Sequence, residues 1–181
     1  MTPTRYDTSL LIGATGMLAR VLAEVAARST RTVAVARHAS HSLAAAPAEM
    51  GILPVDLDWR DTDAFVDGVV AATAGCRVDL VVLWMHGTGK AATDRLLDRY
   101  ARTDCTIVHV LSSAAPDPAA FRAALPHPEG RPPRCRYLTV KLGAVTEDGR
   151  FHRWLTHDEI AGAVLSAIDE GRDIVAGTLP G

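Results

Sequence analysis

The chain has 181 residues, of which 48% are hydrophobic as in an ordinary globular protein, and a formal net charge of −2 with a predicted pI of about 6.4. This length predicts one domain over residues 1–181. The balanced charge argues against nucleic acid or an anionic membrane as a partner. Because no apolar run approaches the ~20 residues that span a bilayer and no signal peptide is visible, we expect a cytoplasmic protein. The three cysteines lie far apart with no C-x-x-C pair, and no metal site is predicted.

The most strongly patterned stretch is residues 8–26, TSLLIGATGMLARVLAEVA. Residues 10–12 form the unbroken apolar run of a strand that is covered on both faces. Apolar side chains then recur at helical spacing, at Leu18, Val21, Leu22 and Val25. The stretch predicts a strand, a glycine turn and an amphipathic helix in direct succession, with the helix ending near residues 29 and 30.

The glycine turn has the composition of a dinucleotide-binding corner. Gly13 can supply the backbone angles of a sharp turn, Gly16 lets a pyrophosphate approach the main chain, and Ala19 is small enough for helix and strand to pack closely. The N–H groups and the dipole of the new helix then face the anion. We expect the cofactor to contact the whole turn, which comprises Gly13, Ala14, Thr15, Gly16, Met17 and Leu18.

A second strand is expected at residues 32–36, and Arg37 follows it. In a dinucleotide fold this position lies beside the adenosine ribose, where a carboxylate would select NAD and a guanidinium can bond to the 2′-phosphate of NADP. The sequence offers Arg37, His38, Ser40 and His41 there and no carboxylate. Charge-assisted bonds of about 1.5–3 kcal/mol each correspond to about ten- to a hundredfold preference, so NADP(H) is the predicted cofactor. The other interpretation of Arg37 is a solvated side chain at a strand end.

The third strand, at residues 52–57, ends with Asp56 and Leu57. We expect the Asp56 carboxylate to accept a hydrogen bond from the adenine and Leu57 to lie against the adenine face. The alternative is that Asp56 caps the following helix, for which Asp61 and Thr62 are the other candidates.

Further strands are predicted at residues 78–84, 106–111, 136–142 and 173–179, with helices between them. The last helix opens with the capping box Thr156-x-x-Glu159 and ends at Gly171. Residues 114–135 hold six prolines and allow at most a short helix capped by Asp117. Because strands that alternate with helices form parallel sheets, we predict a single doubly wound Rossmann domain of the α/β class, with a mostly parallel sheet of six to seven strands.

Five segments together resemble the short-chain dehydrogenase/reductase superfamily: LLIGATGMLA, VAVARH, PVDLDWRD, IVHVLSS and KLGAV. The chain is most similar to the small atypical branch of that superfamily, which includes biliverdin/flavin reductases and NmrA-like proteins. It also resembles small bacterial Rossmann proteins that carry W-x-H after the fourth strand and R-W-L-T-H-x-E-I near the end. The resemblance implies an NADP-binding fold in which the glycine turn and Arg37 surround the cofactor together with Trp84, Met85, His86, Leu142 and Gly143.

The sequence departs from the superfamily's pattern at the nicotinamide end. The usual P-G after the sixth strand is Leu142-Gly143, and residues 84–87 replace the usual N-N-A-G after the fourth. The superfamily's catalytic Tyr-x-x-x-Lys spacing occurs at Tyr137 and Lys141. Four residues separate two side chains by about 6 Å on a helix but by about 13 Å in a strand. Because this segment has strand composition, we interpret the match as coincidence.

Three candidate catalytic residues are expected at the carboxyl ends of the strands, where open α/β sheets bind ligands. His86 can donate a proton to the substrate, Ser112 can orient the substrate or the nicotinamide, and Lys141 can stabilise developing negative charge. Each also has a structural interpretation: a histidine bonded to backbone, a hydroxyl that satisfies a loop, and a lysine in water. Candidates for a lip over the same mouth are His152, Arg153, Trp154 and His157.

These features predict an NADPH-dependent oxidoreductase that transfers hydride to a small carbonyl, imine, quinone or flavin-like acceptor. The alternative is a non-catalytic NADP(H)-binding sensor whose ligand alters association with a protein partner. Loss of the tyrosine helix favours the sensor, whereas the histidine and serines at the strand ends favour the reductase. A homodimer through the last helices is expected by analogy with related folds.

Overall fold

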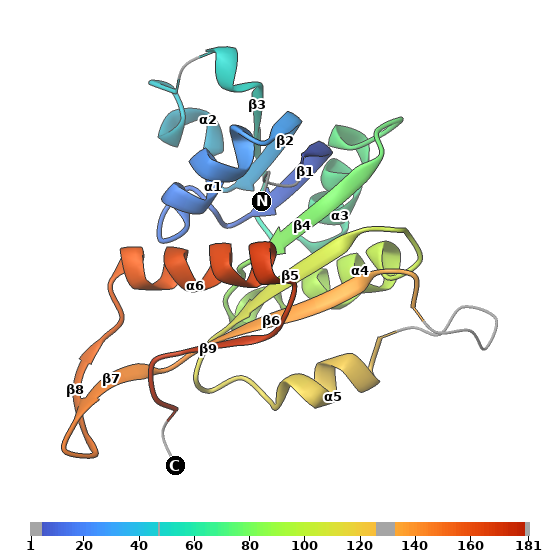
Figure 1. Cartoon of the computed structure of the whole chain (residues 1–181). Coiled ribbons are helices and arrows are strands. Elements are labelled where there is room, and N and C mark those ends of the chain that lie inside the picture. Colours follow the sequence, from blue (N-terminus) through green and yellow to red (C-terminus); the bar gives the residue numbers. More distant parts are fainter. Residues whose placement is uncertain (1–4, 47, 126–132, 180–181) are drawn as a thin grey trace.

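The computed structural model describes residues 5–46, 48–125 and 133–179. Within these residues seven strands form one sheet (Figure 1): β1 (Tyr6–Ile12), β2 (Ser29–Ala36), β3 (Ile52–Asp56), β4 (Val78–Leu83), β5 (Thr106–Leu111), β6 (Arg136–Leu142) and β9 (Ile174–Ala176). Their order is β3-β2-β1-β4-β5-β6-β9, and each neighbouring pair is parallel. The predicted α/β class and doubly wound parallel sheet are therefore confirmed.

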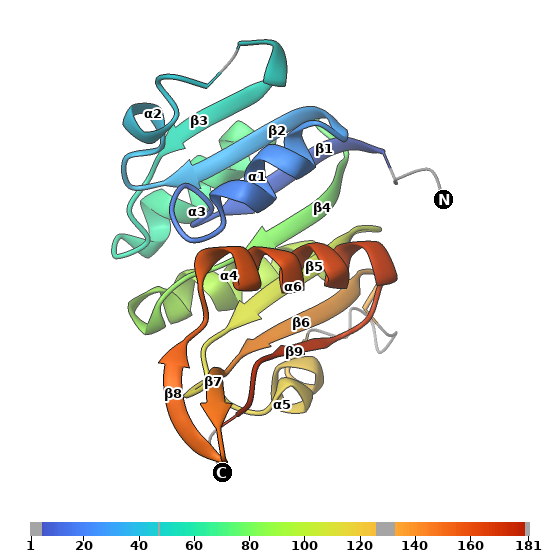
Figure 2. The ribbon, with the colours of Figure 1, turned by 60° about the vertical axis from the view of Figure 1, so that its left-hand side comes forward.

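Helices cover both faces of the sheet. Figure 2 shows α1 (Ala19–Ala26) and α6 (His157–Glu170) on the near face, with α3 (Thr62–Ala72) and α4 (Lys90–Tyr100) behind the sheet. The short helix α5 (Pro118–Ala123) lies beside β6, with Asp117 as its cap. Three single turns complete the helices: α2 (Ala39–Ser42), η1 (Ala48–Met50) and η2 (Gly87–Gly89). No helix in the described residues has both the length and the apolar character needed to cross a membrane.

The apolar run of β1 is buried from both sides, as its sequence predicts. Leu11 packs into the core beneath α1 and α6, whereas Leu10 and Ile12 pack into the core beneath α3 and α4. All three side chains are fully buried. A strand with helices on both faces needs apolar residues at every position, which is why the run does not alternate.

The predicted boundaries hold at some elements and fail at others. β5 and β6 have the predicted bounds, and α6 carries both hydrogen bonds of the capping box between Thr156 and Glu159. The first helix was expected to reach residues 29 and 30, which is wrong because α1 ends at Ala26. The Ser29 hydroxyl donates to the Val25 carbonyl oxygen at 2.7 Å, and Ser29 is the first residue of β2.

A β-hairpin between β6 and α6 is absent from the sequence predictions. It comprises β7 (Ala144–Glu147) and β8 (Arg150–Trp154), which pair antiparallel and project from the carboxyl edge of the sheet in Figure 2. Asp148 and Gly149 form its turn with φ of 49° and 74°. Asp-Gly is a strong sequence signal for a hairpin because the two-residue turn needs positive φ at both positions. The turn could therefore have been predicted from the sequence. The strand was not, because every residue of β8 is exposed and no alternation of burial marks it.

Gly13 joins the ends of three strands at the point where the strand order reverses. Its N–H donates to the Val35 carbonyl at 2.9 Å, while the Trp84 N–H donates to the Ile12 carbonyl at 3.0 Å. Gly13 has φ of 74°, and a Cβ at this position would overlap the carbonyl oxygen of Trp84. Only glycine satisfies both conditions at this turn.

We expect Gly13→Ala to destabilise the protein by about 1–3 kcal/mol or more. Alanine would be strained at this φ, and its Cβ would displace the end of β4. Gly16→Ala is the matched control, since a Cβ there meets no atom within 4 Å and should change stability by less than about 0.5 kcal/mol. Urea denaturation of both variants measures the difference. Equal stabilities would contradict the packing of Gly13 against β4.

Candidate functional site

The glycine turn, residues 13–18, presents main-chain N–H groups on an open surface. Among the described residues, the amides of Gly13 and Ala19 donate to backbone carbonyls, whereas those between them make no well-formed backbone hydrogen bond. Gly16 is exposed, and the space next to it is empty of protein atoms. A turn of this kind before a helix can accept an anion on its N–H groups, so the residues present fit a diphosphate.

The side chains of the turn have different surroundings. Ala14 and Leu18 are buried in the core, so they can offer only their backbone to a ligand, while Thr15 and Met17 are half-buried. Ala19 was expected to let α1 pack closely on the sheet, and this is wrong because Ala19 is exposed. Leu18, the residue before the first turn of α1, fills the space between helix and sheet instead.

Arg37 is exposed directly after β2, at the same carboxyl edge of the sheet as the glycine turn. Its guanidinium carbon lies 6.0 Å from the centre of the Trp59 ring, in the range of a cation–π contact. Hydrogen bonds from Arg60 lower the pKa of the Asp58 carboxyl to about 2, and the charge of Arg37 adds to this effect. His38 and Ser40 are exposed at the start of α2.

Asp56 has a partner that neither prediction named. Its Oδ1 accepts a hydrogen bond from the Ser40 N–H at 2.8 Å, and this bond holds the pKa of the carboxyl below its usual range. Asp56 therefore caps α2, which precedes it, whereas α3 is capped by Asp61. Its predicted bond to adenine would use the carboxylate's remaining acceptor positions.

Leu57 points toward α3. A Cβ added at Gly68 of that helix would lie 2.7 Å from both Leu57 δ-carbons. The side chain of Leu57 therefore packs mainly on α3. The predicted contact with the adenine face would involve only the part of Leu57 that α3 leaves uncovered.

Trp59 is a residue of this edge that the sequence predictions missed. Its ring lies 6.3 Å from that of His86, which in turn lies 5.3 Å from that of Trp84. The indole N–H of Trp59 donates to the Thr88 hydroxyl at 3.2 Å. These rings bridge the ends of β3 and β4, next to Arg37. The signal that could have found Trp59 is its position directly after the third strand, where aromatic side chains can stack on a ligand.

A pocket of about 590 Å³ opens at the carboxyl ends of β4 and β5, between α4 and α5. Two of the predicted catalytic residues, His86 and Ser112, line it, as do Trp84 and Met85. The remaining lining residues are Gly87, Lys90, Thr93, Asp94, His109, Val110, Leu111, Ala114, Ala115, Pro116, Ala120, Phe121 and Ala124.

Lys141, Leu142 and Gly143 lie outside this lining. The Lys141 ammonium donates to the Ala115 carbonyl oxygen at 3.1 Å, which ties the loop after β5 to β6. Leu142 is buried in the core beneath α6, and a Cβ on Gly143 would overlap the carbonyl oxygen of Thr178. The turn after β6 thus packs against the segment after β9 rather than against the pocket.

The predicted lip residues also lie elsewhere. His152, Arg153 and Trp154 belong to β8, and His157 begins α6; none of them lines the pocket. Arg153 forms two hydrogen bonds with Glu159, of 2.8 and 2.9 Å, so the hairpin is fixed to the start of α6.

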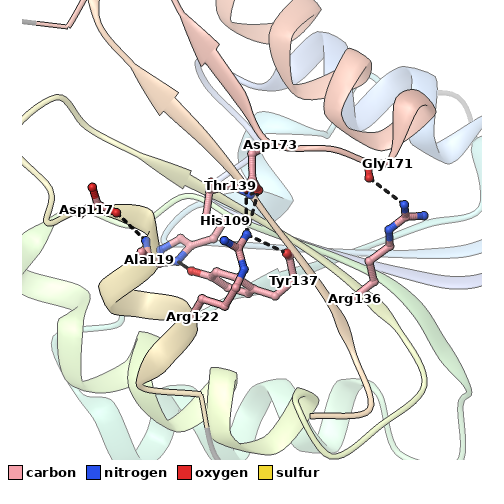
Figure 3. A network of polar contacts seen from close by, with 9 residues as sticks. All are labelled: His109, Asp117, Ala119, Arg122, Arg136, Tyr137, Thr139, Gly171 and Asp173. Atoms are coloured by element: carbon pink, nitrogen blue, oxygen red, sulfur yellow. Dashed lines mark hydrogen bonds and ion pairs between the residues drawn. The ribbon is translucent and has the colours of Figure 1, made fainter. Parts of the chain in front are cut away.

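Tyr137 and Lys141 both lie on β6, which confirms that their spacing is not that of a catalytic helix. The Tyr137 hydroxyl has another partner: it lies 2.8 Å from Nδ1 of His109, on the neighbouring strand β5 (Figure 3). Both side chains are buried, and desolvation lowers the pKa of His109 to about 4 and raises the pKa of Tyr137. His109 is the buried titratable side chain of the pocket, and sequence reasoning missed it.

Helix α5 covers this pair and is held by charges (Figure 3). Phe121 packs edge-on against the His109 ring, with centroids 5.2 Å apart. The next residue, Arg122, places its guanidinium 6.0 Å from the Tyr137 ring centre and donates to the Asp173 carboxylate at 2.8 Å. Asp173 also accepts from the Thr139 N–H at 2.8 Å, so α5 is tied to both β6 and the start of β9.

Comparison with known proteins identifies the fold. No protein-family model and no curated protein sequence matches the chain. Among solved structures, a short-chain type dehydrogenase/reductase from Mycobacterium marinum aligns over 97% of this chain and 95% of its own, with 20% identity and a TM-score of 0.61. BdcA in complex with NADPH aligns over 98% of this chain and 97% of its own, with 16% identity and a TM-score of 0.63. A short chain dehydrogenase from Burkholderia cenocepacia J2315 in complex with NADP aligns over 94% of this chain and 96% of its own, with 15% identity and a TM-score of 0.56.

The chain therefore has the fold of the short-chain dehydrogenases/reductases. The described residues contain no cluster of three or more histidine, cysteine, aspartate or glutamate side chains placed to hold a metal ion.

The buried His109 should make stability depend on pH. Its pKa is about 4 in the folded protein and about 6.5 in an unfolded chain, so between these values the unfolded state binds more protons. Folding stability should fall as the pH drops below about 6.5, and this histidine should account for about 3 kcal/mol of the loss near pH 4.

The measurement is urea denaturation of the wild type and of His109→Gln at pH 7 and pH 4. All other titrating groups are common to the two proteins, so the wild type should lose about 3 kcal/mol more than the variant. The same loss in both proteins would show that His109 is not buried in its neutral form.

Proposed function

We propose that the protein belongs to the short-chain dehydrogenase/reductase superfamily, in its small atypical branch, and reduces a small carbonyl, imine, quinone or flavin-like acceptor with NADPH. Its fold and the segments that resemble this superfamily support the assignment. The similar structures described in complex with NADPH and NADP support the choice of cofactor.

The observation that carries the proposal is the joint between the glycine turn and the pocket. The backbone carbonyl of Trp84 lies against Gly13, and Trp84 is also one of the residues that line the pocket. A dinucleotide whose diphosphate lies on the turn would extend along the strand ends toward β4 and β5, where the pocket opens. This neighbourhood of turn and pocket supports a cofactor on the first and its acceptor in the second.

The residues at the adenosine end would hold the cofactor by charge and main-chain hydrogen bonds. N–H groups of residues 14–18 would donate to the diphosphate. The Arg37 guanidinium would bond to the 2′-phosphate, and the exposed His38 and Ser40 lie beside it in sequence. Trp59 lies next to Arg37, with its ring centre 6.0 Å from the guanidinium carbon.

NADPH, when bound, supplies the hydride. His86 is exposed at the pocket and can deliver the proton that completes reduction, while the Ser112 hydroxyl can orient the acceptor. The Lys141 ammonium donates one hydrogen bond to the Ala115 carbonyl oxygen, so it can position the loop that carries Ser112. Its other N–H donors would serve the expected role of stabilising negative charge on the substrate.

The second candidate function is a non-catalytic NADP(H) sensor. One observation favours it: α5, which stands between β5 and β6, is six residues long and contains neither tyrosine nor lysine. The usual proton donor of the superfamily is thus missing from this helix.

Arg37→Glu should weaken NADPH binding by about ten- to a hundredfold, because it removes a charge-assisted bond to the 2′-phosphate. NADH binding should change by much less. Arg150→Glu is the matched control, since Arg150 is exposed on β8 and the substitution changes the net charge equally. Calorimetric titration of the three proteins with both nucleotides decides the question, and equal weakening of NADPH and NADH would contradict a phosphate contact.

Incubation with NADPH and a panel of ketones, imines, quinones and free flavin separates the two functions. We expect loss of the reduced-nicotinamide absorbance with at least one of these acceptor classes. NADPH binding without turnover on every class would favour the sensor over the reductase.

A further inference from the structure

The pocket between α4 and α5 has the chemistry of a site for an uncharged ligand. Its walls are largely apolar, with Met85, Leu111 and Phe121 among the larger side chains. The two charged residues at its rim neutralise each other, because Lys90 Nζ lies 2.5 Å from the Asp94 carboxylate. A free anion or cation would lose its hydration here and gain no opposite charge in exchange.

Two buried polar side chains line this space, Thr93 and His109, and the Thr93 hydroxyl is already used in a hydrogen bond to the Gly89 carbonyl oxygen at 3.0 Å. His109 is 6% exposed, and its ring borders the pocket. Its Nδ1 is occupied by the Tyr137 hydroxyl. His109 lines the pocket, and its Nδ1 is turned toward Tyr137 on β6. The other ring nitrogen, Nε2, is therefore the one that a ligand in the pocket can use.

The partner of Nδ1 determines which nitrogen carries the hydrogen. Burial raises the pKa of Tyr137, so its phenol keeps its proton and must donate it to an acceptor. The acceptor within reach is Nδ1 of His109. We therefore assign the hydrogen of the neutral imidazole to Nε2, and burial keeps this ring neutral by lowering its pKa to about 4.

We propose that this pocket binds an uncharged, largely apolar carbonyl compound whose oxygen accepts a hydrogen bond from Nε2–H of His109. The proposal deepens the proposed function, on which it rests, by naming the acceptor class and the residue that holds its oxygen. A neutral imidazole fixed in one tautomer can polarise a carbonyl oxygen without bringing a full charge into an apolar site. Tyr137 is then a positioning residue, because it acts on the ligand only through the His109 tautomer.

The test compares two probes of the same shape, 2-acetylnaphthalene and 2-isopropenylnaphthalene, which differ in the carbonyl oxygen. Both are titrated into the protein without nucleotide and followed by NMR. Between the wild type and His109→Leu, the ratio of ketone affinity to alkene affinity should fall about tenfold, because the variant loses the donor but keeps the apolar walls. Met85→Leu is the matched control, since it reshapes another apolar wall of the pocket and should leave this ratio unchanged. An unchanged ratio in His109→Leu would overturn the proposal.

A measurement on the wild type covers the case in which His109→Leu does not fold. Nitrogen-15 spectra of the histidine side chains should show the His109 hydrogen on Nε2, and addition of the ketone should shift the Nε2 resonance whereas the alkene should not. A hydrogen on Nδ1, or the same response to both probes, would overturn the proposal.

Calorimetry with NADPH on the same samples separates this inference from the proposed function. Ketone selectivity that depends on His109 in a protein that binds no NADPH would support the pocket assignment and refute the reductase. NADPH binding with no such selectivity would refute the pocket assignment alone.

Discussion

The close approach of Gly13 to the carbonyl group of Trp84 is the constraint on which the rest of the structure depends. It brings the turn after β1 against the tip of β4, where the strand order of the sheet reverses. Ligands of doubly wound folds bind at such a reversal because the helices on either side diverge there. The same contact places the N–H groups of the turn on one side of β4 and the pocket on the other, so one glycine links the two halves of the candidate site.

The second half of the site is a consequence of a short helix. α5 has six residues, and the side chains it extends over the sheet are those of Phe121 and Arg122. The ion pair of Arg122 with Asp173 fixes this helix over β6, so the pocket wall is anchored from outside the pocket. A helix of this length leaves the strand ends open beside it, where His109 of β5 borders the cavity. The same six residues contain neither tyrosine nor lysine, so α5 offers no proton donor of those kinds to a ligand in the pocket.

How much the sequence could predict depends on the range of the interaction. The apolar run of β1, the glycine turn and the Thr156 capping box are set by residues close together in the chain, and each was predicted from its local pattern. The partners of Asp56 and Lys141 were not, because both side chains bond to backbone groups whose position depends on loop geometry. His109 is the clearest case. In TIVHVL it is indistinguishable from a core residue, and the tyrosine that orients it lies 28 positions away on the next strand.

The central claim is that the glycine turn binds a nucleotide diphosphate and directs the rest of the cofactor toward the pocket. A crystal structure of the protein grown with NADPH tests it most directly. In that crystal we expect diphosphate oxygens within hydrogen-bonding distance of N–H groups of residues 14–18, the 2′-phosphate on Arg37, and the nicotinamide at the pocket beside Trp84. A nucleotide bound anywhere else on the molecule, or a turn whose N–H groups contact no phosphate, would contradict it.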